Sequence, residues 1–184
     1  MRNYLLIGLL LGLFVACETK TDPFAITNHS VGMLTDSIKV NALKVVFAND
    51  SISKYIGGDE FTGSTNTISV FEKGTGVLLL ELDPNYSLDS LSTIRTVRIM
   101  DERFKNKDGL NRLSTFGDIN SKYTISSIQN TLRSLIISVD EINAYFTLNK
   151  TELPEEMRYD MNQKIEAISI PETAKIKDFY LQWY

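Results

Sequence analysis

Apolar residues in this chain fall into short runs that alternate with polar residues or stop at turn formers, a pattern typical of β-strands. The internal runs cover residues 67–72, 77–82, 92–100, 134–139 and 143–148. In the final stretch, 176–184, the period-two rule places Phe179, Leu181 and Trp183 on one strand face. We therefore expect the C-terminus to belong to the sheet, and its truncation to destabilise the domain.

The first two runs flank Lys73-Gly74-Thr75-Gly76, which predicts a β-hairpin whose glycines take positive φ. The second arm, 77–82, is almost entirely apolar. Such composition is typical of a central strand covered on both faces, and we expect this position for it.

Helices are fewer and shorter in this pattern. Residues 152–164 predict one, with Pro154 and the carboxylates of Glu155 and Glu156 in its first turn. Two further segments each run from a glycine through hydroxyl-bearing caps into a short helix and then a strand. They occupy residues 32–47 and 109–123. We expect an α+β fold, mainly antiparallel sheet with two or three short helices and two weakly similar helix-then-strand units.

The N-terminus has the order of an export signal. Arg2 supplies a positive charge, residues 5–15 an apolar stretch, and Ala16 a small residue beside a cleavage point. The apolar stretch is shorter than the roughly 20 residues that span a bilayer, so cleavage is favoured over a permanent transmembrane helix. An ordinary signal peptide cut after Ala16 is the alternative, and it would leave a free thiol on Cys17.

Leu13-Phe14-Val15-Ala16-Cys17 resembles the lipobox of bacterial lipoproteins, with Phe14 where that family usually has leucine. The resemblance implies that Cys17 becomes the first residue and carries a diacylglyceryl group and fatty acyl chains such as palmitate. It divides the chain into a signal peptide at 1–16, a lipidated tether at 17–25 and a single α+β domain at 26–184. It also places the domain in the cell envelope, tethered to the inner or, as we favour, the outer membrane, and facing the periplasm or the cell surface.

The net charge of the chain limits the classes of binding partner that we expect. The formal net charge is −4, and loss of Arg2 with the signal peptide makes it −5, so neither nucleic acid nor anionic lipid is attracted electrostatically. Basic residues are dispersed among acids, as in 95–103, which is typical of a solvated face. Cys17 is the only cysteine, so the domain must be held together by its core without disulfides.

Motifs for chemistry are absent from the sequence. His29 is the only histidine, and no Gly-x-Ser-x-Gly, phosphate-binding loop or dinucleotide fingerprint occurs. Without other His or Cys residues we predict no metal site, no cofactor and no catalytic residue. Residues 83–89 place oxygen ligands at alternate positions but lack the glycine and glutamate of a calcium loop, and we interpret them as a turn.

Three Asp-Ser-aliphatic triplets resemble the O-glycosylation sequon of exported Bacteroidetes proteins. Their acceptor residues would be Ser37, Ser51 and Ser90. Together with the lipobox and a composition rich in Lys, Asn, Ile and Ser, the triplets make the chain similar to uncharacterised Bacteroidetes lipoproteins.

Two functions remain open on this sequence. We favour a non-enzymatic envelope lipoprotein that binds an unknown protein or glycan, or assists assembly, through strand faces and aromatics such as Tyr145, Tyr180 and Tyr184. The alternative is a small extracytoplasmic hydrolase or inhibitor whose site residues come from separate loops. A deep polar pocket with two carboxylates or a perturbed base would favour the enzyme.

Overall fold

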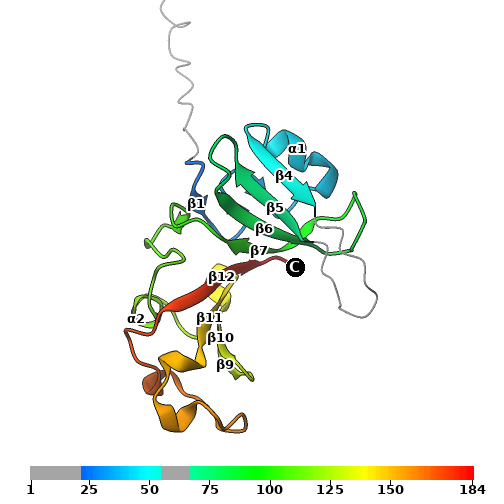
Figure 1. Ribbon diagram of the computed structural model, residues 1–184. Coiled ribbons are helices and arrows are strands. Elements are labelled where there is room, and N and C mark those ends of the chain that lie inside the picture. The colour runs from blue at the N-terminus through cyan, green and yellow to red at the C-terminus, as the bar shows by residue number, and fades with distance from the viewer. Residues whose placement is uncertain (1–21, 55–66) are drawn as a thin grey trace, which may run out of the picture.

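The computed structural model describes residues 22–54 and 67–184, so the predicted lipid site at Cys17 lies outside the described residues. An eight-stranded antiparallel sheet with the order β4-β5-β6-β7-β12-β11-β10-β9 runs through the molecule (Figure 1). Its strands are β4 Asp50–Lys54, β5 Ile68–Glu72, β6 Leu78–Pro84, β7 Ile94–Ile99, β9 Ser127–Asn130, β10 Ser134–Val139, β11 Ala144–Asn149 and β12 Ile176–Gln182.

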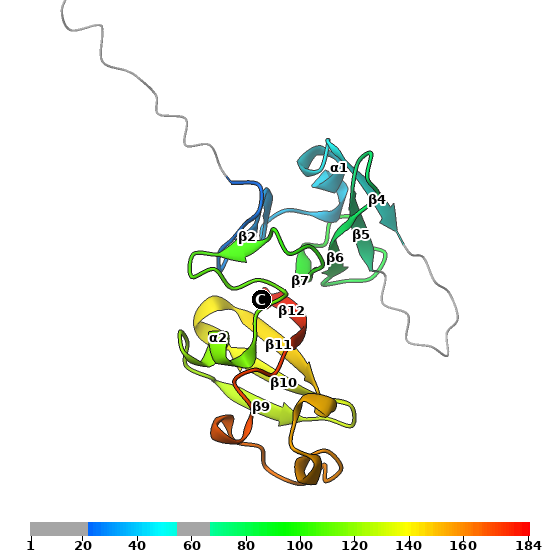
Figure 2. The same ribbon diagram turned by 60° about the vertical axis from the view of Figure 1, so that its left-hand side comes forward.

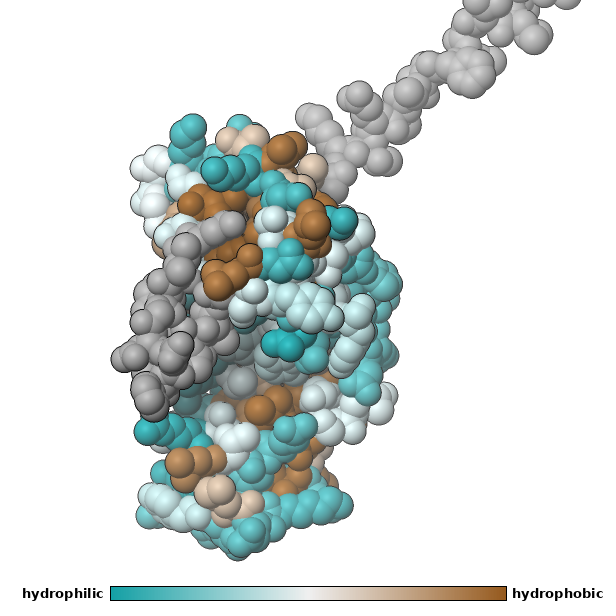
Figure 3. Space-filling view, turned by 90° about the vertical axis from the view of Figure 1, so that its right-hand side faces the viewer, coloured by the Kyte–Doolittle hydropathy of each residue, from teal (hydrophilic) through white to brown (hydrophobic). Residues whose placement is uncertain are grey.

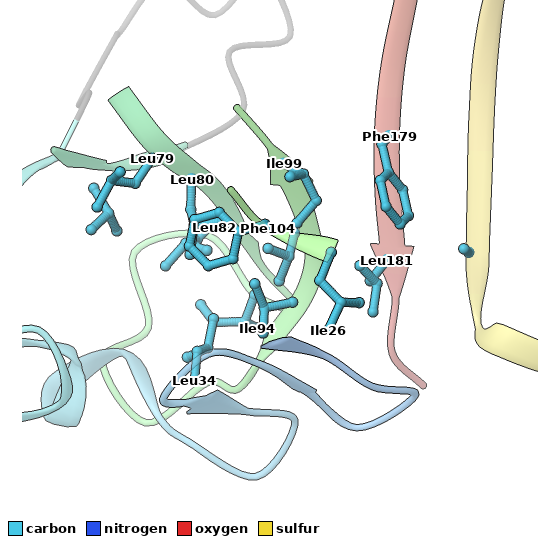
Figure 4. Close-up of a cluster of buried hydrophobic side chains, with 14 of the residues drawn as sticks. Ile26, Leu34, Leu79, Leu80, Leu82, Ile94, Ile99, Phe104, Phe179 and Leu181 are labelled. Carbon is cyan, nitrogen blue, oxygen red and sulfur yellow. The ribbon is translucent and has the colours of Figure 1, made fainter. Parts of the chain in front are cut away.

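A small second sheet has the order β3-β2-β1-β8. Its strands are β1 Ala25–Ile26, β2 Ser30–Val31, β3 Leu34–Thr35 and β8 Lys105–Asn106, and β1 pairs with β8 in parallel. Side chains of this small sheet pack toward β6, β7 and β12 of the large sheet, as Ile26 and Leu34 do in Figure 4.

The helices are short, and the α+β class predicted from the sequence is confirmed. They are the α-helices α1 Leu43–Val46 and α2 Phe116–Asn120, and the 3-10 turns η1 Val40–Ala42, η2 Asp140–Ile142, η3 Lys150–Glu152, η4 Glu155–Met157 and η5 Ala167–Ser169. A capping box starts α2: Thr115 Oγ1 accepts from the Asp118 amide, and the Asp118 carboxylate accepts from the Thr115 amide. No side chain caps η1, which leads into α1, so the hydroxyl cap predicted for the first unit is wrong.

The predicted hairpin is confirmed, but its second strand is not covered by apolar residues on both faces. Gly74 and Gly76 have φ of +93° and +71° in the turn between β5 and β6. Although β6 lies inside the sheet, only one of its faces is apolar, because Glu81 points to the opposite side and pairs with Arg98.

The C-terminal strand is also confirmed. β12 lies between β7 and β11 at the centre of the large sheet, and the side chains of Phe179, Leu181 and Trp183 are buried. The residues that end the chain therefore join the strands from its two halves.

The α-helix predicted at 152–164 is wrong. The segment contains η4 followed by bends, and its apolar residues form no continuous stripe, since Leu153 is buried while Tyr159 and Met161 are exposed. Local polar bonds compete with helical ones: the Asp160 carboxylate accepts from the Asn162 amide, and the Arg158 guanidinium donates to the Leu153 carbonyl.

Two apolar clusters fill the same face of the large sheet. The larger one extends from β4–β7, the small sheet and α1 across β12 to β11, and the smaller one lies among β10, β11, α2 and the segment 153–174. Figures 1 and 2 show these as two halves joined by the β7–β12 pair. Phe24 packs edge-on against Phe104 at 5.0 Å, and β1 starts at Ala25, so the ordered domain begins inside the segment assigned to the tether.

Candidate functional site

A single cross-strand row on one face of the large sheet contains only residues with hydroxyl or charged side chains. Register pairs join its members across all eight strands. From β9 to β4 they are Ser127, Ser138, Tyr145, Tyr180, Arg98, Glu81, Ser69 and Ser53. We call this row the polar ladder.

The next row points to the opposite face and is entirely apolar. Its members are Ile128, Ile137, Phe146, Phe179, Ile99, Leu80, Val70 and Ile52. Because adjacent residues of a strand face opposite sides, the two rows give the sheet one core face and one polar face. The polar face is where this fold can present chemistry.

Arg98 organises the centre of the polar ladder. Its Nη1 donates to Glu81 Oε2 at 2.6 Å, and its Nη2 and Nε donate to Asp178 Oδ1 at 2.6 and 3.2 Å. Thr147 Oγ1 donates to the other oxygen of Asp178 at 2.8 Å. Burial works to lower the pKa of Arg98, but the hydrogen bonds to Asp178 and Glu81 outweigh it and raise that pKa. Both carboxylates are thus held by one permanent cation.

Tyr145 and Tyr180 form a stack beside this cluster. Their ring centroids are 4.5 Å apart with an interplanar angle of 9°, and the Arg98 guanidinium lies 5.8 Å from the centroid of Tyr180. Burial raises the pKa of the Tyr145 hydroxyl to about 12 and also raises that of Tyr180. Both phenols are therefore neutral near pH 7 and able to donate a hydrogen bond.

A hollow of about 250 Å³ opens beside Tyr145. Its lining consists of Ser138, Asp140, Asn143, Ala144, Tyr145, Gln182 and Tyr184. Ser138 of β10, Tyr145 of β11 and Gln182 of β12 line it, so the hollow lies over the ends of these three strands beside the tyrosine stack. The three aromatics named from the sequence thus come together: Tyr145 and Tyr180 stack, and the fully exposed Tyr184 lines the same hollow as Tyr145.

The three predicted glycosylation serines are all exposed, in the half of the molecule that contains α1. Ser37 follows β3, Ser51 lies in the edge strand β4, and Ser90 lies in the turn between β6 and β7. That turn includes most of the segment 83–89, as its interpretation as a turn requires. Modification of these serines remains a prediction.

The remaining ionisable candidates do not form a site. His29 is 76% exposed at its side chain and pairs with Asp36 at 2.6 Å on the surface. Lys150 Nζ and Asn130 Oδ1 are buried without a hydrogen-bond partner, but neither residue lines the hollow. Within 22–54 and 67–184, no group of three or more His, Cys, Asp or Glu residues is placed to hold a metal ion.

Sequence reasoning missed the Arg98 cluster. The dispersed charges in 95–103 predict a solvated face, yet the side chain of Arg98 is only 32% exposed and that of Asp178 only 11%. The available signal is the strand period, which puts Arg98 out of phase with the apolar Val97 and Ile99 and in phase with Thr96. Its partners Glu81 and Asp178 are distant in sequence, and only the strand order brings them to it.

Comparisons with known proteins identify a similar fold but no activity. No protein family matches the sequence, and no curated protein matches it. The crystal structure of the uncharacterized protein yfeY from Escherichia coli is similar, with a TM-score of 0.56 and 12% sequence identity over 86% of this chain and 99% of that chain. Among the described residues, no helix has the length and apolarity to cross a membrane. At this identity the likeness is one of fold alone.

Proposed function

We propose that this protein is a lipid-anchored envelope protein, without enzymatic activity, that binds a glycan in the hollow beside Tyr145. The observation that carries the proposal is a hollow of about 250 Å³ in which the rings of Tyr145 and Tyr184 lie among polar side chains. The predicted lipobox at Cys17 supports the anchor.

The chemistry of the lining suits a sugar ring. The C–H groups of a pyranose pack on an aromatic face, and its hydroxyl groups need donors and acceptors around the rim. Asn143 and Gln182 offer both through their side-chain amides, and Asp140 offers acceptors. Because Tyr145 is stacked on Tyr180 and the Arg98 cluster fixes the neighbouring strands, the platform is already ordered before a ligand binds.

The hydrolase alternative finds less support at this place. A glycosidase usually flanks its substrate with two carboxyl groups about 5–9.5 Å apart. The lining of the hollow contains only one carboxylate, Asp140. The carboxylates of Glu81 and Asp178 are engaged by Arg98 and do not line the hollow.

The test is a search for glycan binding by residues 18–184, which lack the predicted lipid. An array of neutral and acidic oligosaccharides, including peptidoglycan fragments, would identify a candidate, and saturation-transfer NMR would map the contact. We expect Tyr145→Ala to abolish binding and Tyr145→Phe to retain most of it, because the phenyl face is kept. Ser138→Leu should also abolish binding by filling the hollow.

Tyr159→Ala is the matched control, since that tyrosine is 80% exposed and does not line the hollow. Its binding should equal that of the unmodified sequence. Absence of binding to every oligosaccharide, or unchanged binding by a folded Ser138→Leu variant, would overturn the proposal. Appearance of cleaved oligosaccharide would instead support the hydrolase.

A further inference from the structure

A second, apolar groove lies at the end of the molecule where the described chain begins. It has a volume of about 440 Å³. Phe24 and Val31 line it from the N-terminal side, Val45 and Phe47 from the region of α1, and Leu79 and Phe104 from β6 and the segment before β8. Figures 1 and 2 both show β1 and α1 at this same end.

Apolar side chains are exposed at the rim of this groove. Met33 is 55% exposed in the turn between β2 and β3, and Val45 is 79% exposed on α1. Figure 3 shows hydrophobic residues at this upper end of the molecule, and further ones in its lower half. The lining of this groove is more apolar than that of the hollow beside Tyr145.

Ion pairs hold part of the charge at the rim. Arg103 donates to Glu72 at 2.7 Å and to Asp101 at 2.9 Å, and its guanidinium lies 4.5 Å from the ring centroid of Phe24. Asp50 also lines the groove, and burial, followed by the charge of Glu72, raises the pKa of its carboxyl group. The single cation Arg103 is thus shared between two carboxylates, and Asp50 adds a third carboxylate at one side of the groove.

The length of chain before this groove limits what can cover it. Asp22, the first described residue, follows Cys17 by only five positions. Even a fully extended chain spans at most about 3.6 Å per residue, so Asp22 stays within about 18 Å of a lipid-modified Cys17. Such a short connection keeps the end of the domain that contains Asp22, Met33 and Val45 near the bilayer.

We infer that Met33, Val45 and the groove between them contact the surface of the phospholipid bilayer in which Cys17 is anchored. The inference rests on the lipid anchor of the proposed function, but not on its glycan ligand. Two exposed side chains give weak membrane affinity by themselves. The anchor makes the contact intramolecular, which raises its effective concentration to the millimolar range. The opposite half of the molecule is then held away from the membrane.

The test uses the full lipid-modified protein in nanodiscs of phosphatidylethanolamine and phosphatidylglycerol. Its intact mass first establishes whether Cys17 is lipidated. Gadolinium chelates on the lipid headgroups then attenuate the methyl NMR signals of residues near the bilayer. We expect loss of the Met33 and Val45 methyl signals and retention of that of Ile168, which is 92% exposed in the other half.

A matched pair of variants isolates the apolar contact. Met33→Ser/Val45→Ser should weaken the attenuation of the Val46 signal, which also reports on the groove, because the tether alone holds this end less closely to the bilayer. Leu132→Ser/Ile168→Ser removes side chains that are even more exposed elsewhere and should leave the attenuation of Val46 unchanged. A lipidated protein with equal attenuation at Met33 and Ile168 would overturn the inference while leaving the anchor intact. Protection of Met33 in protein without nanodiscs would point to a second copy and would also overturn it. An unlipidated mass would refute the anchor, and the membrane contact with it.

Discussion

Replacement of Arg98 by methionine tests whether one cation holds the polar ladder together. The variant leaves the carboxylates of Glu81 and Asp178, with side chains 25% and 11% exposed, without their partner. Breaking a buried ion pair costs about 3–5 kcal/mol, and an exposed one contributes about 0–1 kcal/mol. Because Arg98 is itself 32% exposed, we expect a loss of about 2 kcal/mol in the free energy of unfolding. In a chain of this size that corresponds to a Tm lower by about 4–8 °C.

Urea unfolding followed by circular dichroism measures this loss. Arg95→Met is the control, because Arg95 is exposed on the same strand and should change stability by less than about 0.5 kcal/mol. Adding Glu81→Gln and Asp178→Asn to Arg98→Met removes the unpaired charges and should recover much of the loss. A stability of Arg98→Met equal to that of Arg95→Met would refute the reasoning, as would a triple variant no more stable than the single one.

Three further predictions follow from the fold and the tyrosine stack. Deletion of residues 176–184 should abolish cooperative thermal unfolding, because it removes the central strand; a cooperative transition in the truncated chain would contradict this. Thr115→Ala should lower the urea-derived free energy of unfolding by about 1 kcal/mol through loss of the α2 capping box, whereas Thr75→Ala, in an exposed turn, should change it little. The raised pKa of Tyr145, about 12 against an ordinary 10, contributes stability that is present below pH 10 and lost as pH rises through 12. The free energy of unfolding of Tyr145→Phe, measured with urea, should therefore fall less between pH 10 and 12 than that of the unmodified sequence. Equal falls in the two proteins would exclude the effect.

Strands were the part of this fold most visible in the sequence. The hairpin around Gly74 and Gly76 and the C-terminal strand both follow from local period and turn chemistry, and both are present. The helix predicted at 152–164 is wrong because only its start resembles a helix, through a proline and two glutamates. The segment has no apolar stripe that would stabilise a helix. Local start signals without an apolar face do not make a helix.

The candidate site was only partly visible. Tyr145, Tyr180 and Tyr184 could be named as candidate binding residues, but their meeting depends on β12 lying beside β11, which no local pattern specifies. The same holds for Arg98, whose two acidic partners lie 17 and 80 positions away along the chain. Sites built across strands of distant origin become visible only when strand order is known.

The position of β12 also sets the order in which this chain can fold. β7 ends at Ile99, but the strand that pairs with its free edge does not begin until Ile176. While the chain emerges from the ribosome, the two halves lack the strand that joins them until β12 has been synthesised. Contacts of such long sequence separation form slowly. The eight-stranded sheet is therefore completed only after β12 has been synthesised, and the pairing of β7 with β12 is expected to be among the last contacts to form.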